Sequence, residues 1–155
     1  MPALHNAIAK IKIDTNQDPE SFLLNNQYYN SKIVGKFCEE RDPHFAVIAY
    51  KRAWGECDKE LIECTNKYNL FRLQARYLVE RQSPELWAEC LNPNNTNRKL
   101  LVEQVVSVAL PESKNVEEVA KTVEAFLSAD MPLELLALLE KIVLHNQEFG
   151  TYKYL

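Results

Sequence analysis

At Asp18-Pro19, Asp42-Pro43 and Ser83-Pro84 a polar residue is followed directly by proline. An apolar stretch with helical spacing follows each pair. Proline fits the first turn of a helix because its missing N–H has no partner there, and aspartate or serine just before it accepts a free backbone N–H. We expect Asp42 to be such an N-cap. A chain that opens helix after helix in this way is predicted to be all-α.

Glycine is scarce, with Gly35, Gly55 and Gly150 the only three in 155 residues. Glycine supplies positive-φ turns and the loops that hold phosphate groups. Its scarcity therefore disfavours dinucleotide-binding folds, phosphate-binding loops and hairpin-rich β structure. No segment shows convincing strand periodicity.

About ten short helices joined by short turns are expected. Asn69 is expected to cap one of them and Pro111 to end another, while Asn115 with Glu118 resembles a capping box. The first segment carries an apolar stripe through Leu4, Ala7, Ile8 and Ile11. The expected helical segments are 4–11, 19–23, 33–38, 43–52, 58–68, 70–82, 84–91, 98–110, 116–129 and 133–146.

Two of these segments carry apolar stripes of double width. In segment 98–110 the stripes are Leu101, Val105 and Val108 beside Val102, Val106 and Ala109. In the last segment they are Leu135, Leu139 and Ile142 beside Leu136 and Val143. A helix facing one core needs one stripe, so a double stripe predicts packing against two neighbours. This favours an α-solenoid of stacked antiparallel hairpins over a closed bundle.

No arrangement of residues suggests catalysis, a metal or a cofactor. His5, His44 and His145 lie in different segments without a second ligand at metal-binding spacing. The net charge of -4 excludes a broad basic surface for nucleic acid, and we interpret Arg72 and Arg76 as a solvated face. Trp87 is expected in the core. Trp54, at a turn, is the candidate interface residue, with packing under the turn as the alternative.

The cysteines and apolar runs indicate a reduced, intracellular and soluble chain. Cys38, Cys57, Cys64 and Cys90 contain no Cys-x-x-Cys pair. Cys57 and Cys64 lie on one helix face, and we interpret them as small buried apolar groups, with a reactive thiol as the alternative. The longest apolar run near the C-terminus, residues 135–139, is too short to cross a bilayer. No direct membrane insertion is expected.

Long stretches of the sequence resemble the clathrin heavy chain family. The similarity runs in collinear order from about Leu4 to Phe149 and departs from the family by a small insertion around Ala53-Trp54. The stretches that carry it are LHNAIAKIKID, YYNSKIVGKFCEERDPHFAVIAY, CDKELIECTNKYNLFRLQARYLVERQSPELW and LLVEQVVSVALPESKNVEEVAKTVEAFLSADMPLELLALLEKIVL.

The resemblance implies that residues 1–155 are one segment of a helical-repeat solenoid and a fragment of a longer chain. It implies a structural strut in the leg of a clathrin lattice, without enzyme activity, at the cytoplasmic face of coated pits and vesicles. The implied partners are other heavy-chain legs, in a trimer whose light chains bind outside this segment. A clathrin-repeat module of a vesicle-tethering complex is the alternative.

Overall fold

The computed structural model describes residues 1–145, and these divide between Leu70 and Phe71 into two compact units. Helices account for all the regular structure in residues 1–145, and no strand occurs among them. The run α8, η1 and α9 is continuous, so this part of the chain has ten helices when that run counts as one. The all-α prediction is confirmed.

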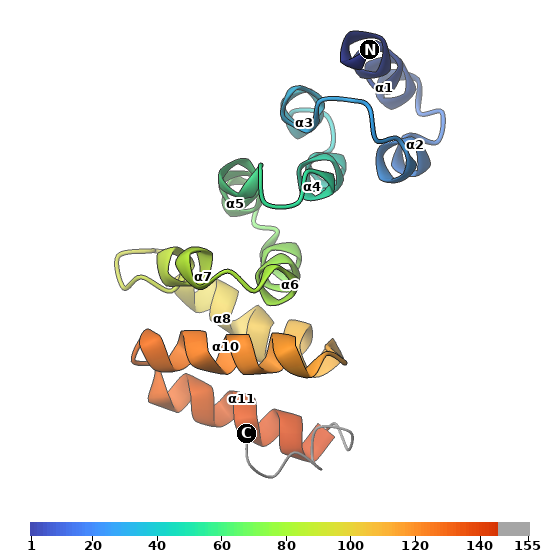
Figure 1. Ribbon diagram of the computed structural model, residues 1–155. Helices are drawn as coiled ribbons and strands as arrows, with labels where there is room; N and C mark the ends of the chain where they lie inside the picture. The colour runs from blue at the N-terminus through green and yellow to red at the C-terminus, as the bar shows by residue number, and fades with distance from the viewer. Residues whose placement is uncertain (146–155) are drawn as a thin grey trace. The chain divides into compact units, whose positions relative to one another are not determined.

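The first unit stacks its helices in two rows. Helix α1 packs on α3 and α2 packs on α4, while α1 with α2 and α3 with α4 form neighbouring pairs (Figure 1). Helix α5 follows against α4. Alternation between two rows is the arrangement of stacked helical hairpins. The elements are α1 (Pro2–Thr15), α2 (Pro19–Asn25), α3 (Ser31–Glu39), α4 (Pro43–Arg52) and α5 (Asp58–Lys67).

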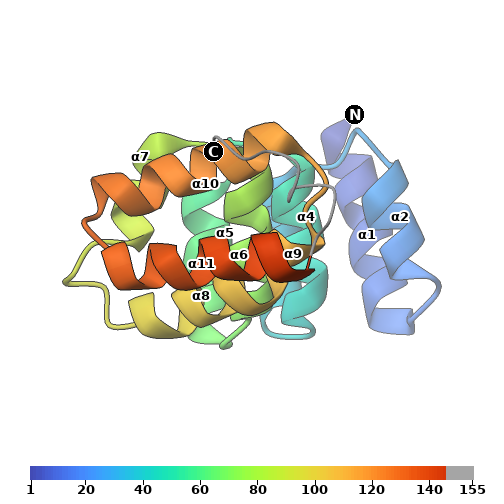
Figure 2. The same ribbon diagram turned by 90° about the horizontal axis from the view of Figure 1, so that it is seen from below.

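The second unit centres on a helical run that contacts helices on two sides. Element η1 packs against both α6 and α11, and α10 packs against α6, α7 and α11. Figure 2 shows α10 and α11 as neighbouring helices of this unit. The elements are α6 (Phe71–Arg81), α7 (Pro84–Cys90), α8 (Arg98–Gln104), η1 (Val105–Ala109), α9 (Leu110–Glu112), α10 (Val116–Ser128) and α11 (Pro132–His145).

The predicted helix starts are confirmed, although one of them lacks its side-chain cap. The Asp42 carboxylate accepts the backbone N–H of His44 at 3.0 Å, and the Ser83 hydroxyl accepts that of Leu86 at 3.3 Å. Asp18 precedes Pro19 as predicted, but it has φ 51° and makes no capping bond with its side chain. Proline at the first position thus marks the start of a helix more reliably than the residue before it.

Asn115 caps α10 by accepting the backbone N–H of Glu117 at 2.9 Å. The capping-box expectation differs in its second half. The Glu118 carboxylate accepts a hydrogen bond from the Ser113 hydroxyl at 2.7 Å. Glu118 therefore holds the turn that leads into α10.

The expectation that Asn69 caps the following helix is wrong, because Asn69 ends the preceding one. Its φ is 57°, its N–H bonds to the carbonyl of Asn66, and the next N–H, of Leu70, bonds to the carbonyl of Thr65 at 2.8 Å. This is the Schellman motif, in which the left-handed residue is usually glycine.

The same pair of bonds ends two other helices. Asn16 has φ 53° after α1, and Asp130 has φ 54° after α10. Asparagine and aspartate tolerate the left-handed region better than most other residues with a Cβ. The chain is poor in glycine because these two residue types occupy its helix ends.

The expectation that Pro111 ends its helix is also wrong, since the helical run continues to Glu112. The turn before it is widened, and the N–H of Leu110 bonds to the carbonyl of Val105, five residues earlier. This bond makes Val105–Ala109 a π-helical turn inside an otherwise α-helical run.

The double stripe of segment 98–110 is confirmed. Leu101, Val105, Val102 and Ala109 are buried, and Val106 and Val108 are half-buried. The two stripes match the two neighbours of η1, namely α6 and α11.

The stripes of the first and last helices do not have the predicted burial. On α1, Leu4 and Ile11 are each 61% exposed, and the buried residues are Asn6 and Ala9. On α11, Leu135, Leu138 and Ile142 are buried, whereas Leu136 and Val143 are exposed. Both helices therefore present an apolar face that no described residue of their own unit covers.

Candidate interaction surface

Trp54 lies on the turn between α4 and α5, where the sequence predicted a break. Its side chain is 48% exposed. The N–H of Trp54 bonds to the carbonyl of Lys51 at 3.0 Å, and Gly55 follows with φ 93°. Glycine adopts this conformation without strain, which lets the chain reverse within the turn. The turn presents Trp54 at the edge of a groove.

The groove next to Trp54 has a volume of about 660 Å³ and belongs entirely to the first unit. Tyr28, from the loop between α2 and α3, also lines the groove and is exposed. Its ring lies 5.1 Å from the His5 ring, centroid to centroid. Two exposed aromatic side chains along one groove suit contact with another protein, because aromatic residues dominate interface energies. Sequence reasoning named Trp54, whose interface role stays a prediction, and did not name Tyr28.

Arg52 also lines this groove, and its side chain holds the neighbouring loop in place. The sequence alone did not indicate this role. The Nη2 of Arg52 donates to the backbone carbonyl of Tyr29 at 2.7 Å and to the hydroxyl of Ser31 at 3.3 Å. The guanidinium carbon lies 4.1 Å from the centre of the Tyr29 ring, a cation–π contact. Arg52 thereby ties the end of α4 to the loop between α2 and α3.

Charges of both signs surround the groove. The ammonium group of Lys32 lies 3.4 Å from the carboxylate of Glu60, and Glu56 belongs to the groove wall. Partial burial alone raises the pKa of Glu60, but its own backbone N–H and Lys32 stabilise the carboxylate, and the net pKa is lowered. The mixed charge favours a protein partner over a uniformly charged polymer.

The four cysteines are buried and form no disulfide, which confirms the interpretation of Cys57 and Cys64 as buried apolar groups. Burial raises the pKa of Cys38 and Cys90 to about 12 and that of Cys64 to about 11. Burial also raises the pKa of Cys57. Thiols with these values stay protonated near neutral pH and have little nucleophilic character.

The histidines and acidic groups do not converge. His44 contacts Asp42 of its own helix start, and His5 contacts Asn26 at 2.9 Å. The side chain of His145 lies outside the described residues. Within residues 1–145 no three His, Cys, Asp or Glu side chains come together as metal ligands, and none of the described helices is long and apolar enough to cross a membrane.

Arg72 and Arg76 are not simply solvated, because both contact the carboxylate of Glu112. The distance from Arg72 Nη2 to Glu112 is 3.4 Å. These two ion pairs join α6 to the end of α9 inside the second unit. These arginines therefore have a structural partner, which differs from our expectation.

A family model described as "Clathrin: Region in Clathrin and VPS" matches residues 1–102. The chain belongs to the Clathrin family. Its membership and its helices confirm the predicted class, an all-α solenoid of helical hairpins.

Curated members of the Clathrin family match nearly the whole chain. The clathrin heavy chain of Dictyostelium discoideum is 60% identical over 154 residues, which is 99% of this chain and 9% of that protein. Clathrin heavy chain 1 of Arabidopsis thaliana is 58% identical over 147 residues, 95% of this chain and 8% of that protein. Human clathrin heavy chain 2 is 53% identical over 154 residues, which is 99% of this chain and 9% of that protein. The chain thus spans less than a tenth of the length of these relatives.

Proposed function

We propose that this segment is a structural strut in the leg of a clathrin heavy chain and that it supports coat formation in endocytosis and vesicle transport. The observation that carries the proposal is the identity of 50–60% to clathrin heavy chains over 95–99% of this chain. A match of this length includes the turns as well as the helices.

The packing of the helices supports a strut. A run that contacts helices on both sides makes apolar burial continuous from one hairpin to the next, and continuous burial resists bending. The uncovered apolar faces of α1 and α11 suit contact with adjoining repeats. In this proposal residues 1–155 form one solenoid segment of a longer chain.

The proposed partners are the legs of other heavy chains, in trimers whose light chains bind outside this segment. The proposed setting is the cytoplasmic face of coated pits and vesicles, and the segment acts without catalysis or a cofactor. Trp54 is proposed as a lateral contact. Single leg contacts are weak, and many of them sum through multivalency.

An interaction module of a vesicle-tethering complex is the second candidate, because the matching family includes VPS proteins. The heavy-chain identities favour the coat. Solution scattering tests the strut itself, since a compact domain of this length has a radius of gyration near ~15 Å. A clearly larger value at infinite dilution supports a rod-like segment, and a value near ~15 Å counts against it.

The coat role is tested with a chimera of the Dictyostelium heavy chain in which this chain replaces its 60% identical counterpart. The chimera should form trimers and assemble into cages in vitro at a critical concentration close to that of the parent. Trimers with normal helical content that fail to assemble would refute the coat role. Selective capture of one partner by those trimers would favour the tethering module.

The contact at Trp54 is tested in the same chimera by Trp54→Ser. Loss of an aromatic interface residue should raise the critical concentration for assembly by about threefold or more. Leu100→Ser is the matched control, because Leu100 is equally exposed and lies outside the groove. Equal assembly by both variants would exclude Trp54 from the contact.

A further inference from the structure

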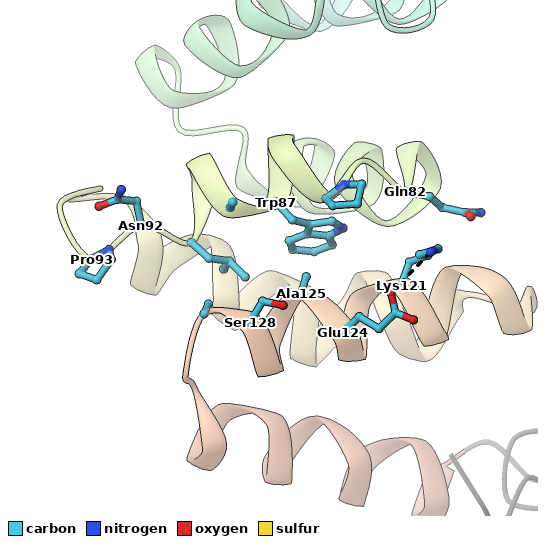
Figure 3. A pocket seen from close by; sticks show the side chains of 12 residues that line it. Gln82, Trp87, Asn92, Pro93, Lys121, Glu124, Ala125 and Ser128 are labelled. Carbon is cyan, nitrogen blue, oxygen red and sulfur yellow. Dashed lines mark ion pairs between the residues drawn. The ribbon is translucent and has the colours of Figure 1, made fainter.

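A second hollow of about 320 Å³ lies inside the second unit, between α7 and α10 (Figure 3). Trp87 forms its floor, and Asn92 and Pro93 lie at one end. At the other end Lys121 and Glu124 form an ion pair of 3.5 Å. The volume is at the lower limit for ligand pockets and matches one or two side chains of a peptide.

The pocket exists because small residues line the helices on either side of it. Helix α7 contributes Ala88, and α10 contributes Ala125, Ser128 and the adjoining Ala129. The spacing of 125, 128 and 129 places these three residues on one face of α10. Larger side chains at these positions would fill the space and cover the indole of Trp87.

Trp87 brings an unused hydrogen-bond donor to this pocket. Its side chain is 1% exposed, and its ring packs edge-on against Phe126 at a centroid distance of 6.1 Å. The indole Nε1 is buried and makes no hydrogen bond. Figure 3 shows this nitrogen on the side of the pocket where Lys121 and Glu124 lie. A buried N–H without an acceptor lowers the stability of the fold. A hydrogen-bond acceptor that enters the pocket and bonds to this N–H therefore contributes more binding free energy than the same bond would at the surface.

The charges at the rim select against an ionic ligand. Lys121 and Glu124 neutralise each other, and no other charged side chain lines the pocket. An anion or a cation would have to break that pair. A neutral group with an apolar body and a carbonyl oxygen fits both the floor and the free donor.

We propose that this pocket is a docking site for a short neutral peptide segment of a partner protein. The segment places an aliphatic side chain against Trp87 and a backbone carbonyl on the indole N–H. This site is independent of the groove at Trp54, and the proposal does not depend on the coat role. Its binding is measured on the isolated 155-residue chain, whatever that chain does in a coat.

The experiment titrates N-acetyl-leucine methylamide into the ¹⁵N-labelled chain and follows its two indole N–H signals. The Trp87 signal should move downfield and saturate, because a hydrogen bond forms there, while the Trp54 signal stays in place. N-acetyl-glycine methylamide should bind about tenfold more weakly or worse, since it lacks the side chain that is buried. N-acetyl-leucine, with a free carboxylate, should bind no better than the amide.

Ala88→Leu fills the pocket from an exposed position and should abolish the Trp87 shift. Ala7→Leu, at an exposed position on α1, is the matched control and should leave the shift unchanged. Trp87→Phe keeps an aromatic floor without the donor and should weaken binding about threefold or more, as measured by saturation-transfer difference. The proposal is overturned if the two indoles shift equally, if Ala88→Leu still binds, if the glycine probe equals the leucine probe, or if the carboxylate binds best.

Discussion

Gly35 of α3 packs directly against the ring of Tyr50 of α4. A Cβ at Gly35 would lie 2.6 Å from Cδ1 of that ring, well inside van der Waals contact. The Tyr50 ring is fully buried, and its hydroxyl donates to the Glu39 carboxylate at 2.9 Å. The hydroxyl bond fixes the position of the ring, one edge of which faces Gly35, so the close approach of α3 and α4 requires glycine.

Gly35→Ala should therefore lower the free energy of unfolding. Overpacking costs about 2 kcal/mol, and the better helix propensity of alanine offsets up to about 1 kcal/mol of this. Urea denaturation followed by circular dichroism measures the change. In a Tyr50→Leu background the loss should fall by more than half, and an equal loss in both backgrounds would show that the ring is not the cause.

The positive φ of Asn69 leads us to expect that two substitutions at this position change the stability differently. Asn69→Ala places an ordinary Cβ at φ 57° and should destabilise the first unit by about 1 kcal/mol. Asn69→Gly should be neutral or slightly stabilising, because glycine adopts this conformation freely. Thermal denaturation of both variants, with the wild type beside them, gives the comparison. Equal melting temperatures for the two variants would contradict the Schellman assignment.

The buried thiols predict a loss of stability at alkaline pH. The ordinary pKa of a thiol is 9.0, and burial raises the folded-state pKa of Cys90 to about 12. The unfolded chain therefore releases this proton first, so the stabilisation is complete below pH 9 and is lost as the pH rises toward about 12. Each such thiol lowers the unfolding free energy by up to about 1.4 kcal/mol per pH unit in that window. Urea titrations at pH 8, 9 and 10 measure the slope.

Cys90→Ala isolates the contribution of one thiol. The variant should be less stable at pH 8 and should lose stability less steeply above pH 9 than the wild type. In the native protein at pH 7.5, Ellman's reagent should react slowly with all four cysteines and should detect four thiols after denaturation. Rapid reaction of Cys90 in the native state would contradict its burial.

Glu112 holds two arginines of α6, and both pairs are partly exposed. Exposed ion pairs contribute little and are screened by salt. Glu112→Gln should therefore cost under about 1 kcal/mol at low ionic strength, and the difference should shrink in 1 M salt. Glu103→Gln, at an exposed position without a described ion pair, is the control. A large loss that salt does not reduce would indicate a packing role for Glu112.

Helix starts were predictable because they depend on neighbouring residues alone. Pro43 and Pro84 each lie at the first position of a helix, and Asp42 and Ser83 cap as their chemistry requires. Asn69 was assigned to the wrong helix because asparagine suits two positions, the N-cap of one helix and the C′ residue of another. Only the φ angle of Asn69 and the backbone hydrogen bond from Leu70 to Thr65 distinguish these two positions.

Burial and the candidate site were less predictable because they depend on contacts distant in sequence. Leu4 and Leu135 stand in similar patterns, yet Leu4 is exposed and Leu135 is buried, since periodicity identifies a face and not what covers it. The groove at Trp54 combines the turn that follows Arg52 with Tyr28, which comes from the loop between α2 and α3. The spacing of Ala125, Ser128 and Ala129 was a usable signal for the second pocket, because small residues on one helix face leave room for something else.

The π-helical turn Val105–Ala109 also has a consequence for changes in chain length. A π turn contains about one more residue than an α turn, so it absorbs a one-residue insertion without altering the helix on either side. Deletion of Ser107, which is exposed, should restore regular α spacing between Leu101 and the residues that follow the turn. A one-residue deletion elsewhere in these helices would rotate every later side chain by about 100° and move the buried stripe away from its neighbours. The helix between α6 and α11 therefore has one place at which its length can change while its register with both neighbours is kept.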